Sequence, residues 1–66
     1  MDHTMIARVL RINAEIMAVS IEVEGMKAAN MERYLAGESM AYPESEFIQA
    51  ANAVHGYAAD LHQLSF

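Results

Sequence analysis

The sequence predicts an all-α protein, a helical hairpin with a long helix at about residues 4–36, a connector at 37–42 and a second helix at about 43–64. Apolar residues recur at helical spacing through both halves of the chain. Hydrophobic residues make up 55% of the chain and aromatic residues only 8%, so Ala, Leu and Met, which favour helix, contribute much of the apolar content. One Pro and three Gly leave few breaks, and a length of 66 residues allows a single domain, residues 1–66.

The first helix carries two apolar stripes. The first seam alternates spacings of four and three, as in a heptad repeat, and consists of Met5, Val9, Ile12, Ile16, Val19, Val23 and Met26. Beside it runs the second stripe, which consists of Ile6, Leu10, Ala14, Met17, Ile21, Ala28, Met31 and Leu35. Together they cover roughly 200° of the helix, against about 100° for an ordinary surface helix. Asp2 or Thr4 is expected to cap the start, and Gly37 is expected to end the helix.

Three features of this helix leave alternatives open. Gly25 lies mid-helix, where glycine costs about 1 kcal/mol relative to alanine, so a kink or a break is one alternative. Residues 19–25 alternate apolar and polar, which is typical of a strand that would pair with its copy in another subunit. The first seam continues through this stretch in register, and we therefore predict helix. Asn30 falls on the same seam, where it either pairs with its symmetry mate or marks a solvated helix end.

The second helix has the clearest start in the chain. Pro43 is predicted at its first helical position, and Glu44 and Glu46 place negative charge at the positive end of the helix dipole. Its single apolar seam consists of Phe47, Ala50, Val54, Tyr57, Leu61 and Leu64. A connector of this length is typical of antiparallel helices.

One seam on the second helix cannot cover two stripes on the first. A chain this short has a marginal core, and it has no cysteine with which to form a disulfide. We therefore expect a homo-oligomer, in its simplest form a homodimeric four-helix bundle with the long helices at its centre. We predict that the first seam forms the oligomer interface, with Met5, Val9, Ile12, Ile16, Val19, Val23 and Met26.

Composition and spacing argue against several functions. A net charge of −5, with Arg8 and Arg11 as the only close basic pair, disfavours nucleic acid as a partner. No secretory signal or membrane-spanning run is recognised, so we expect a cytoplasmic protein with no membrane partner. No nucleophile motif or phosphate-binding loop occurs, and we expect neither enzyme activity nor a cofactor. His55 and His62 are seven residues apart, about 10 Å along a helix, which is too far to bind one ion directly.

The preferred interpretation is a small acidic helical homo-oligomer that acts as a non-enzymatic protein–protein interaction or accessory regulatory factor. Its predicted partner-binding residues lie in and beside the connector, where aromatic and Met side chains neighbour an acid: Tyr34, Glu38, Met40 and Tyr42. A purely structural role, capping the end of the hairpin core, is the alternative for Met40 and Tyr42. One rival function is a metal or small-ligand site between subunits, built from His55, His62 and glutamates. A second rival is a helical regulator acting on RNA or DNA.

The run EGMKAANMERYLAGESMAYPESEF, residues 24–47, resembles the middle of small uncharacterised open reading frames of tailed phages and prophages. The features that carry the resemblance are Met26-Lys27-Ala28, Asn30, Arg33, Gly37, Ser39, Ala41-Tyr42 and a Glu before Phe47. The resemblance implies an accessory factor of phage or prophage origin that binds host or phage proteins. It transfers no functional residues.

Overall fold

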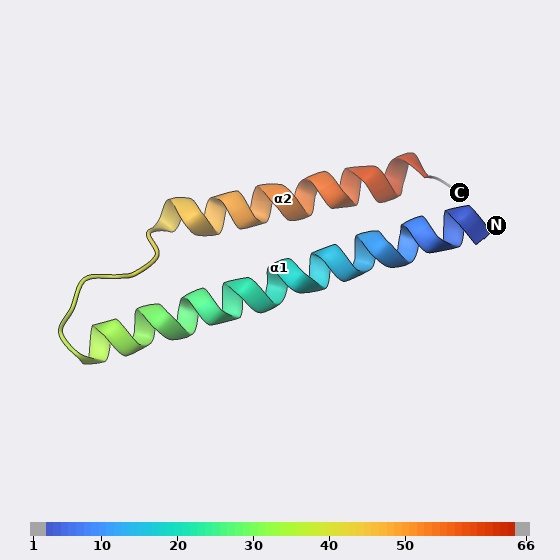
Figure 1. Ribbon diagram of the computed structural model, residues 1–66. Coiled ribbons are helices and arrows are strands. Elements are labelled where there is room, and N and C mark those ends of the chain that lie inside the picture. Colours follow the sequence, from blue (N-terminus) through green and yellow to red (C-terminus); the bar gives the residue numbers. More distant parts are fainter. Residues whose placement is uncertain (1–2, 65–66) are drawn as a thin grey trace.

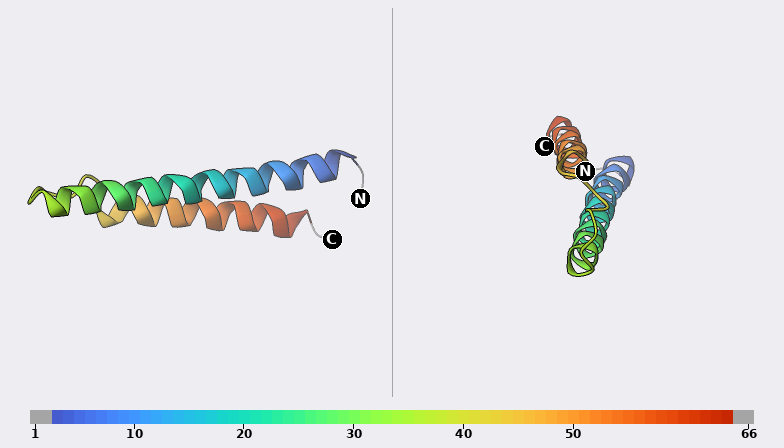
Figure 2. Two further views of the ribbon diagram at one scale, coloured as in Figure 1. Left: turned by 90° about the horizontal axis from the view of Figure 1, so that it is seen from below. Right: turned by 90° about the vertical axis from the view of Figure 1, so that its left-hand side faces the viewer.

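The computed structural model describes residues 3–64, which form two α-helices and no strand. Helix α1 spans His3–Leu35 and α2 spans Glu44–Gln63 (Figure 1). The two helices run antiparallel and side by side, so that the start of α1 and the end of α2 lie at the same end of the molecule (Figures 1 and 2). The predicted all-α hairpin is confirmed, with helix bounds within one residue of those expected.

Helix α1 is continuous over 33 residues and passes through Gly25 without a break. Residues 19–25 are helical, so the strand alternative is wrong. The physical reason is that a helix satisfies its own backbone hydrogen bonds, whereas a strand in this chain would need a second strand beside it. At the start of α1, Asp2 lies outside the described residues, and Thr4 lies inside the helix and does not cap it.

Gly37 ends α1 as predicted. It has a φ of 76°, in the left-handed region that glycine adopts without the steric cost borne by other residues. The amide of Glu38 donates to the carbonyl of Arg33 at 2.8 Å, and the amide of Gly37 donates to the carbonyl of Tyr34 at 3.1 Å. This pair of bonds is a Schellman motif, and it satisfies carbonyls that the end of the helix would leave free.

Pro43 was predicted at the first helical position of α2, but it is the N-cap residue, one position before the helix. Its ψ of 167° is extended, so it caps α2 from outside, and Glu44 is the first helical residue. No side chain caps this end, but the amide of Glu46 donates to the Pro43 carbonyl at 3.0 Å. Glu44 and Glu46 do lie in the first turn, where their charge favours the helix.

The core is the line along which the first seam of α1 meets the seam of α2. Every residue of both seams is buried or half-buried, whereas most other positions of both helices are exposed. Only two of the described hydrophobic side chains are buried, Ile12 at 9% exposure and Leu64 at 8%. Two helices in contact along one line cannot enclose a side chain on all sides, so the core stays shallow.

The hairpin is long and thin, with principal extents of 53 × 17 × 11 Å. Its radius of gyration is 15.8 Å, whereas a compact chain of this length has about 11 Å. Its accessible surface is 5198 Å², and a folded monomer of the same mass exposes about 4,200 Å². The excess of about 1,000 Å² is close to the 800 Å² or so that each partner buries in a standard protein–protein interface.

Candidate interaction surface

The second stripe is the largest open apolar feature of the hairpin. Its six large side chains range from 41% exposed at Ile6 to 76% exposed at Leu35; the others are Leu10, Met17, Ile21 and Met31. At 100° per residue, this stripe lies roughly 150° around α1 from the first seam. Helix α2 therefore covers the opposite side of α1 and leaves the stripe accessible along its whole length.

The first seam, which was the predicted oligomer interface, faces α2 within the chain. Val19 and Val23 line a cleft of about 340 Å³ together with Phe47 and Val54 of α2. The seam is thus used inside the hairpin, and its further use between copies stays a prediction. The sequence prediction assigns the first seam to the interface between copies, but periodicity alone does not decide which stripe of α1 faces α2, because both stripes are apolar and both keep helical spacing.

Asn30 ties the connector to α1. Its side-chain Nδ2 donates to the carbonyl of Tyr42 at 2.9 Å, and its Oδ1 accepts from the amide of Tyr42 at 2.9 Å. The sequence did not indicate this contact, in which Asn30 binds the backbone of its own chain. The amide side chain supplies both a donor and an acceptor, and it holds the connector in one position against the last turns of α1.

The predicted partner-binding residues gather at this closed end of the hairpin. Tyr34 and Met40 line a cleft of about 320 Å³ with Lys27, Asn30 and Met31, and both are exposed. Tyr42 is exposed too, and Asn30 anchors its backbone. Glu38 is exposed on a neighbouring cleft of about 350 Å³, beside Glu32 and Arg33.

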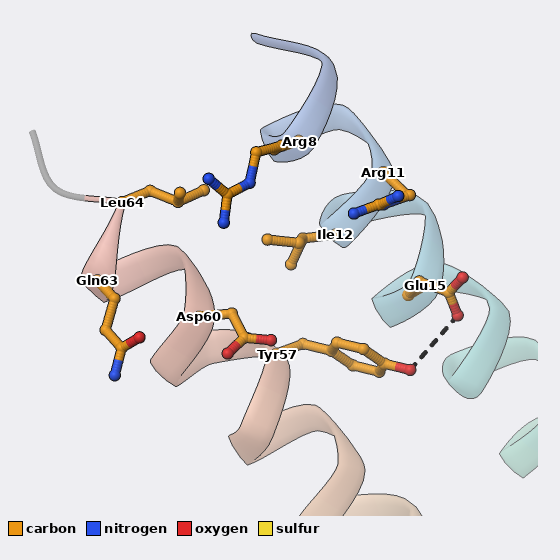
Figure 3. Close-up of a pocket in the computed structure, with 8 residues that line it drawn as sticks. All are labelled: Arg8, Arg11, Ile12, Glu15, Tyr57, Asp60, Gln63 and Leu64. Carbon is orange, nitrogen blue, oxygen red and sulfur yellow. Dashed lines mark hydrogen bonds between the residues drawn. The ribbon is translucent and has the colours of Figure 1, made fainter. Parts of the chain in front are cut away.

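A polar cleft of about 520 Å³ lies between the helices at the opposite, open end (Figure 3). Two guanidinium groups, of Arg8 and Arg11, and two carboxylates, of Glu15 and Asp60, line it, so its charges balance. The hydroxyl of Tyr57 donates to Oε2 of Glu15 at 3.4 Å and links the two helices across the cleft. Sequence reasoning missed this contact because it depends on the axial offset of the helices. A charge-balanced wall favours neither an anion nor a cation.

The two histidines of the alternative metal site, His55 and His62, are both exposed on α2. Within residues 3–64 no three His, Asp or Glu side chains stand close enough together to hold a metal ion. Over the same residues, neither helix has the length and apolar content needed to cross a membrane.

Comparison with known proteins gives no match to any family model, to any curated protein or to any solved structure.

Proposed function

We propose that this chain is a non-enzymatic interaction factor that works as a homodimer, in which the two α1 helices pack together at the centre of a four-helix assembly and each α2 lies on the outer side of its own α1. The observation that supports the proposal is the second stripe, which α2 does not cover. A second copy offers an identical apolar stripe of matching length, and a two-fold pair uses the same surface on both subunits.

The second stripe is large enough to form a dimer interface. Complete burial of a Leu, Ile or Met side chain contributes about 1.5–3 kcal/mol relative to full exposure. Six such side chains per copy, each roughly half to three-quarters exposed, give a gross gain on the order of 10–20 kcal/mol for the pair. Association costs about 4–15 kcal/mol in lost translational and rotational freedom, and the range of net gain that remains includes the roughly 8 kcal/mol that a dimer at micromolar concentration requires.

Light scattering and sedimentation equilibrium test the dimer. The chain has a mass of 7.3 kDa, and the proposal predicts twice that mass at micromolar concentration, with helicity that falls on dilution because the lone hairpin has a shallow core. A stable, fully helical 7.3 kDa particle over the same concentrations would contradict the proposal.

The dimer leaves the connector end free to bind another protein, and we place the partner-binding surface at Tyr34, Glu38, Met40 and Tyr42. Exposed aromatic and Met side chains next to charges are typical of protein interfaces. The resemblance to phage and prophage reading frames is compatible with such an accessory role.

Affinity capture from the native cell, followed by mass spectrometry, tests this surface. The tagged protein and its Tyr34→Ala and Met40→Ala variants are compared with His62→Ala, which changes an exposed residue near the opposite end of the hairpin. The proposal expects a protein that the parent and His62→Ala retain and the two connector variants lose. Equal recovery by all four proteins would place the binding surface elsewhere.

A further inference from the structure

We infer that the two copies pair α1 against α1 in an antiparallel orientation, with the two-fold axis close to Ile21 and Glu22. Arg11 of each copy then lies opposite Glu32 of the partner subunit. This inference rests on the proposed dimer and adds its orientation and its register. Four features of α1 carry it: the order of side-chain sizes along the second stripe, the small residues at its edge, an unpaired charge couple and the position of Glu24.

The second stripe has nearly the same order of sizes read from either end. Large residues stand at both ends, Ile6 and Leu10 at one and Met31 and Leu35 at the other. Between them, Ala14 and Ala28 lie seven residues to either side of Ile21. In an antiparallel pair with its axis near Ile21, the large side chains at each end of one stripe therefore meet large side chains of the partner's stripe. Between the ends, Ala14 of each copy lies opposite Ala28 of the partner subunit. The stripe is complementary to itself in that orientation.

Ala18 and Gly25 are one heptad apart, so they lie on one line along α1, because the helix turns 100° per residue. This line forms one edge of the second stripe. Within the hairpin, a Cβ at Gly25 would meet nothing within 4 Å, so the fold of one chain does not require a glycine there. Antiparallel pairing places Gly25 opposite the partner's Ala18, where two small residues let the helix backbones approach closely. This contact accounts for a glycine that costs the isolated helix about 1 kcal/mol.

Arg11 and Glu32 continue the same edge at heptad spacing, one at each end of the line that contains Ala18 and Gly25. Both are exposed, and neither makes an ion pair with any residue in the described range 3–64. In the antiparallel register they stand opposite each other, twice in each dimer by symmetry. A parallel pair would hold them 21 residues apart, which is about 30 Å along the helix.

Glu24 is the one charged residue at a heptad position of the second stripe. Its Oε1 lies 3.2 Å from Nζ of Lys27, and both side chains are exposed. Parallel pairing would bring the two Glu24 carboxylates face to face, and like charges in contact oppose association. Antiparallel pairing sets each Glu24 near the partner's Met17 instead.

Spin-label distances test the orientation, and the absence of cysteine allows a single label at any chosen site. With a label at Thr4→Cys, near the start of α1, the antiparallel dimer predicts an axial separation of about 50 Å between the two labels. With a label at Glu22→Cys, beside the proposed axis and away from the stripe, it predicts a separation below about 30 Å. A short distance at both sites would establish a parallel pair and overturn the inference. No dipolar signal at either site would overturn the proposed dimer as well.

Charge reversal tests the register. Arg11→Glu and Glu32→Arg should each weaken dimerisation by about tenfold, since each replaces two attractive contacts with two repulsive ones. The double variant should return the dissociation constant to within about threefold of the parent, because the charges are exchanged across the interface. Arg8→Glu makes the same charge change one turn earlier on α1, at a residue that lines the same polar cleft as Arg11 but lies off the proposed edge, and should leave dimerisation unchanged. A double variant as weak as the single ones would show that Arg11 and Glu32 do not meet.

Discussion

Ile21→Glu is the substitution that most directly probes the open stripe. Ile21 lies near the middle of α1 and is 70% exposed, so it takes little part in the contact between α1 and α2. Glutamate favours helix more than isoleucine does, and the hairpin should lose no local stability. The dimer, in contrast, should lose two buried isoleucines and gain two carboxylates close to its two-fold axis.

The size of this effect follows from the exposure of Ile21. Burying the exposed part of one isoleucine is worth about 1–2 kcal/mol, and the dimer buries two, so the loss is about 2–4 kcal/mol before any repulsion between the carboxylates. At 1.4 kcal/mol for each factor of ten, the dissociation constant should rise by at least about 30-fold.

Sedimentation equilibrium over a range of concentrations measures the dissociation constant of the dimer. Circular dichroism on the same samples measures the helicity of the protein. The matched control is Ile48→Glu, the same change at a residue that is 52% exposed on α2 and lies away from the stripe. It should leave the dissociation constant within about threefold of the parent. Ile16→Glu, on the first seam against α2, should instead unfold the chain at every concentration. An Ile21→Glu protein that associates as tightly as the parent would refute the assignment of the stripe to the interface.

Three further outcomes are expected. Asn30→Ala should lower the free energy of unfolding by about 1–3 kcal/mol in thermal melts, because the backbone of Tyr42 loses two 2.9 Å hydrogen bonds. A melting temperature equal to the parent's would mean that these two hydrogen bonds do not contribute to stability. Gly37→Ala should destabilise the protein by about 1 kcal/mol, because residue 37 has a positive φ. Gly56→Ala should stabilise it by a similar amount, because residue 56 lies inside α2 and an added Cβ meets open space. Changes in stability of the same sign for both variants would contradict this conformational explanation. Isothermal titration of chelator-treated protein with zinc, nickel or iron(II) should give no heat and no change in melting temperature, and a saturable heat that His62→Ala abolishes would favour the rival metal site.

Much of the fold was accessible from the sequence because helical periodicity, glycine and proline act locally. The heptad spacing of the first seam outweighed the alternation at residues 19–25, since an amphipathic helix needs only one neighbour whereas a strand needs a ladder of hydrogen bonds. Gly37 was identified as the end of α1 for a reason that its φ confirms. The start of α2 was predicted one residue too early, at Pro43. A φ of about −65° suits both an N-cap residue and a residue of the first helical turn, and only ψ distinguishes the two.

The contacts between elements were less predictable. The hydrogen bonds of Asn30 join residues 12 apart, and the contact of Tyr57 with Glu15 joins residues 42 apart. Both depend on how the connector folds back and where α2 stops along α1, and no local pattern encodes these. The choice of stripe that faces α2 was equally undetermined, because hydrophobic periodicity reports that a face is buried and not what buries it.

The unequal lengths of the helices connect the two surfaces proposed for this protein. Helix α1 has 33 residues and α2 has 20, so α2 lacks about 13 residues of length, roughly 20 Å, to cover all of α1. The part of α1 nearest the connector is therefore the least covered, and there Met31, Tyr34 and Leu35 are all more than half exposed. In an antiparallel dimer, the start of the partner's α1 reaches Met31 and Leu35 on the second stripe, whereas Tyr34 lies at its edge, beside Met40. The shortfall in α2 thus keeps an aromatic surface open at each end of the dimer, where two partner molecules can bind without crossing the two-fold axis.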